Sequence, residues 1–277
     1  AAPDESLNDT WWKENGIPLG PTGNLDECNM FHWTPEDGVD TNVTVKCTNG
    51  WSYDKSGFGE TVTSEWDLVC GDAWQRSLMQ SIIMAGAFVG VISFGRFSDS
   101  FGRKTGFLTG LVLMMIAGIS ASFAGSFKVF NILRFIQSAA IMGVTASLVT
   151  MFMEVMPEKD RIHMNIGFGM GYAVPVLFIP LLSYYLLEFR HMQLAIGLSG
   201  FLLVPFIPFV CESPKWLLAK HRTNEAEKAI TRIINMNKRP MPNMTAVMTR
   251  LTRLAETESA QRSKKLGFID FLKVPIL

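Results

Sequence analysis

Six charged residues lie at the ends of long apolar segments, where side chains of opposite sign can form ion pairs that break and re-form. They are Asp99, Arg103, Glu154, Arg161, Glu212 and Arg222. The first two belong to the stretch 95–104, Gly-Arg-Phe-Ser-Asp-Ser-Phe-Gly-Arg-Lys, whose two glycines allow a tight reversal and close helix approach. We therefore expect a loop that acts as a latch, formed by Gly95, Asp99, Gly102, Arg103 and Lys104. A plain short turn, with bases that only contact lipid headgroups, is the alternative.

Arg134 is the one Lys or Arg inside an apolar segment. A buried charge in lipid costs at least ~2.5 kcal/mol unless it faces a partner or a wet cavity. Gln137, Ser138 and Met142 share its face at helical spacing. We expect this stripe to line a cavity. Snorkelling of Arg134 to the headgroups and ordinary helix packing of the other three are the alternatives.

Several kinds of catalytic chemistry have no motif in this sequence. The four histidines His32, His163, His191 and His221 are scattered, so no metal site is expected. The chain has no G-x-x-x-x-G-K phosphate loop and no G-x-S-x-G nucleophile elbow. The net charge of zero gives no overall attraction to nucleic acid. We expect a protein that is not an enzyme and that uses no cofactor, metal or nucleic acid.

Five apolar runs are long enough to cross a bilayer core of roughly 30 Å. They cover residues 77–95, 105–127, 129–153, 162–187 and 191–211. Because backbone groups in lipid must be paired within their own segment, we expect five helices and an all-α membrane protein. A soluble bundle is disfavoured, since its helices would show a polar face. The G-x-x-x-G pairs Gly86/Gly90, Gly106/Gly110 and Gly167/Gly171 are expected to allow close helix contacts.

The basic residues predict the orientation of these spans. Residues 1–76 carry fourteen Asp and Glu against four Lys and Arg, whereas residues 212–277 carry thirteen Lys and Arg against six acids. By the positive-inside rule, 1–76 is an extracellular segment, 77–211 the transmembrane bundle and 212–277 a cytoplasmic segment with short helices. Those helices are expected to be capped by Ser213 and Asn224. An extracellular start implies a preceding span, or, as the weaker option, a cleaved signal peptide.

The cysteines agree with this topology. Cys28, Cys47 and Cys70 lie in the extracellular segment, where disulfides form. We expect one pair among the three, with the third cysteine bonded to a residue before Ala1 or free, and sequence alone does not decide which two pair. Asn8 and Asn42 begin acceptor sequons on the same side and are predicted glycosylation sites.

Several motifs in register resemble one known family. The pattern G-x-x-x-D-x-x-G-R-K of residues 95–104 looks like the loop signature of the major facilitator superfamily. Residues 47–54, Phe58 and residues 65–70 resemble the external loop of its organic cation, anion and carnitine transporter family. Residues 134–137 with Glu154, residues 190–194 and residues 212–218 look like that family's fourth helix, fifth-to-sixth turn and sixth-helix exit.

The resemblance also implies an architecture and a function for the complete polypeptide. Members of that family have twelve spans in two halves, so this chain would be a fragment holding helices two to six, without the first helix and the second half. It implies secondary active or facilitative transport of small organic ions across the plasma membrane by alternating access. The latch charges would pair in one conformation and separate in the other.

Two departures from the family pattern qualify the resemblance. Ser100 replaces a usual base in the loop, which would weaken the latch. Met142, Thr145 and Val149 occupy positions where cation-type members have a Lys, a Trp and a Tyr, so an aromatic wall for a cation is absent there. This favours anions slightly. The alternative function is a multi-span receptor or adhesion protein whose extracellular segment binds a ligand.

Overall fold

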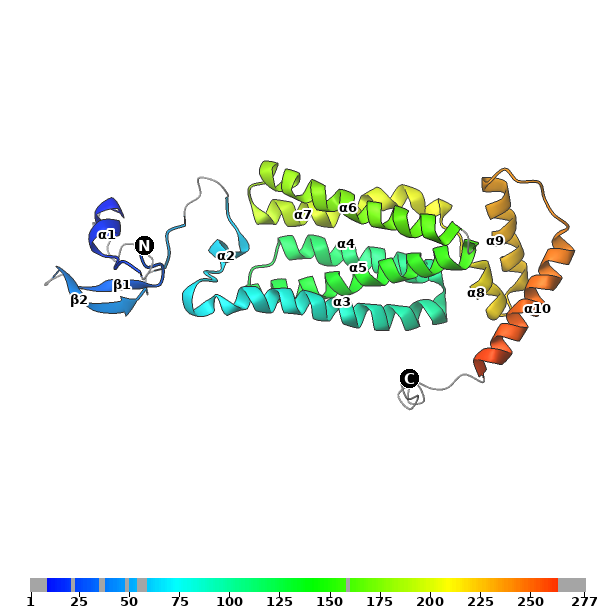
Figure 1. The fold of residues 1–277 in the computed structure, drawn as a ribbon, viewed down its shortest axis with the longest axis horizontal. Coiled ribbons are helices and arrows are strands. Elements are labelled where there is room, and N and C mark those ends of the chain that lie inside the picture. The colour runs from blue at the N-terminus through cyan, green and yellow to red at the C-terminus, as the bar shows by residue number, and fades with distance from the viewer. Residues whose placement is uncertain are drawn as a thin grey trace.

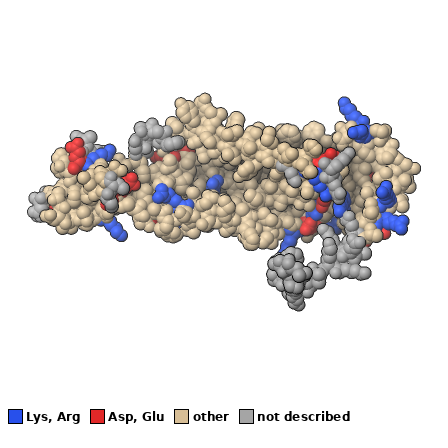
Figure 2. All heavy atoms as spheres, in the orientation of Figure 1, with Lys and Arg blue, Asp and Glu red and all other residues tan. Residues whose placement is uncertain are grey.

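The computed structural model describes residues 9–20, 23–34, 38–47, 50–53, 59–157 and 160–263. A bundle of long helices lies between two smaller parts of the chain (Figure 1). We call residues 9–72 the head region and residues 212–263 the tail region, and we name the two ends of the bundle after them. Charged side chains gather toward the two ends of the face in Figure 2, and the middle of the bundle surface there is uncharged, as suits contact with lipid.

The head region combines a short helix with a two-stranded sheet that the sequence analysis did not anticipate. Helix α1 spans Asp9–Asn15, and strands β1 (Asn29–Thr34) and β2 (Gly38–Lys46) pair antiparallel, with a register shift between Phe31 and His32. Helix α2 (Val62–Glu65) and the 3₁₀ helix η1 (Cys70–Asp72) then lead into the bundle. Helix α2 begins with a capping box, in which Thr61 and Ser64 each bond the other's backbone N–H.

Within the described residues, five helices are long and apolar enough to cross a membrane: Cys70–Phe101, Arg103–Ser122, Phe127–Val155, Arg161–Tyr185 and Phe189–Phe209. They contain α3 (Trp74–Phe101), α4 (Arg103–Ser122), α5 (Phe127–Val155), α6 (Arg161–Tyr185) and α7 (Phe189–Ser199), and the last continues as η3 (Gly200–Phe209). The predicted all-α membrane fold with five spans is thus confirmed.

The fifth span is not α-helical throughout. Helix α7 ends at Ser199, and the rest of the span is the 3₁₀ helix η3, which contains Pro205 and Pro208. Proline has no N–H to donate and its ring collides with the carbonyl four residues earlier, so two prolines close together oppose a regular α-helix. We expected one uniform helix over 191–211, and this is corrected to an α-helix that ends at Ser199 followed by a 3₁₀ helix.

Helices α3 and α4 both pack closely on α5, and glycines make this possible. A Cβ on Gly90 would lie 2.3 Å from the carbonyl oxygen of Ala139, and one on Gly110 would lie 2.9 Å from Val144. Gly86 and Gly106 likewise face α5. Gly167 and Gly171 differ, since neither would bring a Cβ within 4 Å of another atom. The predicted close contact is therefore wrong for this third pair in the described chain.

The tail region folds into three helices around a small apolar core. They are α8 (Pro214–Ala219), α9 (Thr223–Met236) and α10 (Met244–Ser263), and Trp216, Leu217, Leu218 and Ala226 form the core. Ser213 caps α8 as predicted, its side chain accepting from the N–H of Trp216. Asn224 is not a cap, because α9 already begins at Thr223. Helix α10 was not predicted from the sequence.

Candidate functional site

The turn between α3 and α4 is much tighter than the predicted loop. Helix α3 runs on to Phe101 and α4 starts at Arg103, so Gly102 alone lies between them, with φ of 110°. Only glycine adopts that conformation readily. Gly95 lies inside α3, and a Cβ there would meet nothing within 4 Å. The expectation of a loop over 95–104 is therefore wrong, and Gly95 takes no part in the reversal.

Arg103 is the centre of a charge cluster at the tail end of the bundle. Its Nη1 lies 2.5 Å from Asp99 Oδ1, one turn earlier in the chain, and its Nη2 lies 3.0 Å from Glu154 Oε1 on α5. The side chain of Arg103 is 7% exposed and that of Glu154 is 17% exposed. Because water screens this second pair poorly, it is the stronger attraction of the two, Asp99 being 69% exposed.

The tail region joins this cluster through Glu212. The Glu212 carboxylate accepts from the backbone N–H of Arg103 at 2.8 Å and from that of Lys104 at 3.1 Å. These are unpaired donors in the first turn of α4, where the helix dipole favours a negative charge. Trp216 Nε1 adds a bond to the carbonyl oxygen of Asp99, at 2.9 Å. Two contacts thus hold the turn. Glu212 binds the start of α4, and Trp216 of α8 binds the last turn of α3.

Two of the six predicted charges, Arg161 and Arg222, have other partners than the charged groups of this cluster. Arg161 Nη2 donates to the carbonyl oxygen of Met153 at 3.4 Å. Arg222 pairs with Glu225 in the first turn of α9, at 2.7 Å, and its guanidinium lies 6.0 Å from the ring of Trp216. Glu225 was not predicted as a partner, although an acid in a first helical turn is a recognisable signal.

Arg134 lies in a network of buried amides near the head end. Its Nη1 donates to Gln193 Oε1 on α7 at 3.0 Å and to Gln137 Oε1 at 3.4 Å. Gln193 Nε2 closes the network by donating to Gln137 Oε1 at 3.0 Å. Gln137 and Gln193 are 2% and 6% exposed. Gln193 was missed as a partner, because nothing in the sequence shows which face of α7 meets α5.

The rest of the predicted stripe points in other directions. Ser138 Oγ donates to the carbonyl oxygen of Ile83 on α3, and Thr145 Oγ1 donates to that of Ile141 in its own helix. Met142 is exposed and Val149 is half-buried. Arg134, Gln137 and Ser138 therefore contact neighbouring helices. A cavity-lining role for the stripe stays a prediction.

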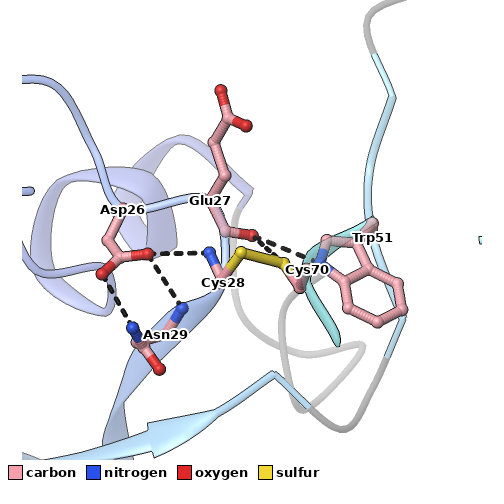
Figure 3. The surroundings of a disulfide bond; sticks show 6 residues. All are labelled: Asp26, Glu27, Cys28, Asn29, Trp51 and Cys70. Carbon is pink, nitrogen blue, oxygen red and sulfur yellow. Dashed lines mark hydrogen bonds between the residues drawn. A yellow bond between two sulfur atoms is a disulfide. The ribbon is translucent and has the colours of Figure 1, made fainter. Parts of the chain in front are cut away.

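The disulfide of the head region joins Cys28 to Cys70, which leaves Cys47 and Cys211 as free thiols (Figure 3). Burial raises the pKa of the Cys47 thiol. Beside the disulfide, the Asp26 carboxylate accepts from the Asn29 side chain and from the N–H of Cys28, which lowers its pKa. Asn42 is exposed on β2, while Asn8 lies outside the described residues.

Tyr53 and Asp67 link the middle of the head region to its end. The Tyr53 hydroxyl donates to Asp67 Oδ1 at 2.9 Å. Burial, followed by this hydrogen bond and the charge of Asp67, raises the pKa of Tyr53 to about 12. The hydrogen bond joins Tyr53 to a residue that lies three positions before Cys70 of the disulfide.

Five apolar spans and a charge-paired turn between two of them define a multi-pass helical membrane protein. The chain belongs to the family of sugar (and other) transporters, whose sequence model matches residues 26–270. It is 29% identical to organic anion transporter 3 of Mus musculus over 94% of this chain and 49% of that protein. It is also 29% identical to solute carrier family 22 member 6-A of Xenopus laevis, over 86% of this chain and 46% of that protein.

These comparisons confirm the resemblance to organic ion transporters. The chain spans about half the length of the curated relatives it matches. Among solved structures, the proton:xylose symporter XylE bound to 6-bromo-6-deoxy-D-glucose is 18% identical, with a TM-score of 0.49 over 65% of this chain and 43% of that protein.

Proposed function

We propose that the chain is part of a secondary carrier that moves small organic ions across the plasma membrane by alternating access. The observation that carries this proposal is the cluster in which Arg103 joins Asp99 and Glu154 while Glu212 holds the start of α4. It ties four segments together at one end of the bundle through contacts that can break without any covalent change. The match to a transporter family supports the same conclusion.

The cluster suits a reversible latch on energetic grounds. A hydrogen bond to a charged group contributes about 1.5–3 kcal/mol to stability. Arg103 and Glu212 make several such bonds, so the closed arrangement gains a few kcal/mol that a second arrangement can replace with water or other partners. Two conformations separated by so little free energy are the condition under which substrate binding shifts their populations.

The proposed topology places the head region outside the cell and the tail region in the cytoplasm, as the excess of Lys and Arg in 212–277 indicates. On this topology Asn42 is open to glycosylation, and so is Asn8. The chain would act together with a first helix and a second half of the same polypeptide. The relatives' greater length supports this, as do the large apolar side chains exposed along α6, such as Ile166, Leu177 and Tyr184.

Organic anions are the proposed substrate class. Two observations on this chain support it beside the names of its relatives. Arg134 donates to the amide oxygens of Gln137 and Gln193, which are uncharged and so do not neutralise its positive charge. Met142, Thr145 and Val149 present no aromatic ring that could hold a cation. The receptor alternative gains no support from the family match, which is to transporters.

Uptake by the complete polypeptide tests this proposal. Matched anionic, zwitterionic and cationic compounds would be compared in cells with equal surface expression, for the wild type, Asp99→Ala and the control Glu225→Gln, whose carboxylate lies outside the cluster. We expect anion accumulation that Asp99→Ala abolishes or strongly slows and Glu225→Gln leaves unchanged. Normal uptake by Asp99→Ala would refute the latch. Saturable binding without accumulation would favour a receptor.

A further inference from the structure

The segment 59–68, which we call the stem, packs against the head end of the bundle. Two backbone hydrogen bonds fix it to the chain just before and at the start of α7. Gly59 N–H donates to the carbonyl oxygen of Leu187 at 3.2 Å, and Phe189 N–H donates to that of Glu60 at 3.0 Å. The stem is therefore attached to the turn between α6 and α7, and it is more than a covalent link into α3.

Trp66 of the stem lies in a cluster of aromatic rings from two spans. Its ring centroid is 5.7 Å from that of Phe127 and 5.1 Å from that of Phe130, both at the start of α5. It is 5.6 Å from that of Phe189, the first residue of α7. Phe130 is 2% exposed, so its ring has little freedom to move unless Trp66 moves.

Arg190 makes a second connection between the stem and the bundle. Its guanidinium forms a two-pronged pair with Glu65, through Nε at 3.1 Å and through Nη2. The same side chain donates to the carbonyl oxygens of Ser122 at 2.7 Å and Ala124 at 2.9 Å, at the end of α4. A cation placed there also meets the negative end of the helix dipole. Arg190 thus fixes α7 relative to both α4 and the stem.

Both connections end at Arg134. The Arg134 guanidinium carbon lies 5.9 Å from the centroid of the Phe130 ring, which is one turn earlier on α5 and packs on Trp66. Arg190 lies one turn before Gln193 on α7, and Gln193 Oε1 accepts from Arg134 Nη1 at 3.0 Å. Phe130, which lies beside the Arg134 guanidinium, is therefore packed against Trp66. Helix α7, which carries Gln193, is bonded to the stem through Arg190.

We propose that Trp66 and Arg190 are positioning residues, through which the stem orients the intramembrane Arg134. A stem that merely anchored the head region would leave Arg134 in place when these contacts are weakened. The consequence for transport rests on the function proposed above, whereas the orientation of Arg134 does not. The two can therefore be tested apart.

Chemical modification of arginine measures the orientation directly. The full chain in lipid nanodiscs would be treated with phenylglyoxal, and the rate at each arginine would be followed by peptide mass spectrometry. Arg96, which is exposed, reports that the reagent acts, and Arg103, which is buried at the tail end, reports general loosening. The variants are Trp66→Leu, Trp66→Phe and the control Trp74→Leu, at an exposed tryptophan outside the ring cluster.

Trp66→Leu should raise the modification rate of Arg134 roughly two- to fivefold, the factor expected from loosening one partly desolvated cation–π contact. Arg103 should stay protected, and Trp66→Phe should restore most of the protection of Arg134 because it keeps a ring. An unchanged Arg134 rate would overturn the inference. So would a rate that rises equally at Arg103, or one that Trp66→Phe fails to restore. If Trp66→Leu does not fold, Arg190→Lys keeps the charge, loses the two-pronged pair and should expose Arg134 in the same way.

Uptake kinetics of the complete polypeptide then separate this inference from the proposed function. Trp66→Leu should raise the KM for an organic anion with little change in the maximal rate, and Trp66→Phe should return the KM toward that of the wild type. If the modification rate of Arg134 changes while the KM does not, the positioning role stands and the role of Arg134 in anion binding fails. If neither changes, the positioning role is refuted.

Discussion

A methyl group at Gly102 should weaken the tail-end cluster, and Gly102→Ala therefore tests how the turn between α3 and α4 is held. The residue has φ of 110° and ψ of 154°, a region of backbone space that is essentially restricted to glycine. Its new Cβ would lie 2.4 Å from Glu212 Oε2. The carboxylate would have to move, although it accepts from the N–H groups of Arg103 and Lys104.

Two costs follow from this geometry. Backbone strain at such a position costs of order 1–3 kcal/mol. Disturbing hydrogen bonds to a charged group costs about 1.5–3 kcal/mol. Because both arise at one turn and partial relaxation relieves each, we expect a total loss of about 2–5 kcal/mol in the free energy of unfolding. In a Glu212→Ala background the carboxylate is already gone, so Gly102→Ala should then cost only the strain.

Gly95→Ala is the matched control for this prediction. Gly95 lies inside α3 with open space around its missing Cβ, so alanine should be neutral or should stabilise the helix by about 0.5–1 kcal/mol. Equilibrium unfolding in mixed micelles, followed by tryptophan fluorescence, would compare both variants with the wild type. Equal midpoints for Gly102→Ala and Gly95→Ala would refute the reasoning, as would an undiminished cost of Gly102→Ala in the Glu212→Ala background.

Three further predictions follow from single positions. Gly90→Ala, whose Cβ would lie 2.3 Å from the α5 backbone, should destabilise the bundle by about 1–3 kcal/mol. The control Gly167→Ala should not, and similar unfolding midpoints for the two variants would contradict this prediction. Tyr53 should ionise near pH 12 in a tyrosinate absorbance titration. Since the unfolded head region loses this proton near 10, its stability should fall as pH rises from 10 to 12, and Tyr53→Phe should remove this component; four tyrosines ionising together would count against it. Cys28→Ser removes a disulfide of sequence separation 42, which should lower the free energy of unfolding of the head region by about 4 kcal/mol, so trypsin should cleave this region faster. The control Cys47→Ser leaves the disulfide in place, and equal protection of both variants would contradict the prediction.

The sequence predicted the broad architecture because lipid imposes a simple rule on it. A run of about twenty apolar residues has no stable backbone arrangement in a bilayer except a helix, and all five predicted spans are such runs, with Arg134 as the one Lys, Arg, Asp or Glu inside them. The cap at Ser213 was predicted for a similar reason, since it depends on residues only three positions apart. The pairing of Asp99 with Arg103 is also local, one turn of the chain apart.

The contacts between distant residues were beyond sequence reasoning. Which cysteine pairs with Cys28, whether Gly95 or Gly102 makes the turn, and which side chain meets Arg134 all depend on how elements rotate and slide against one another. Hydrophobic pattern fixes that a helix is buried in lipid, but an almost uniformly apolar helix does not show which face meets a neighbour.

The number of spans and the location of most charges at their ends therefore follow from the amino-acid pattern alone. The contact of Glu212 with the start of α4 and the pair of Arg190 with Glu65 became visible only in the folded arrangement of the helices. The physical reason is that helix formation in lipid is satisfied within one segment, whereas an ion pair or ring contact between segments exists only once close packing has set their register.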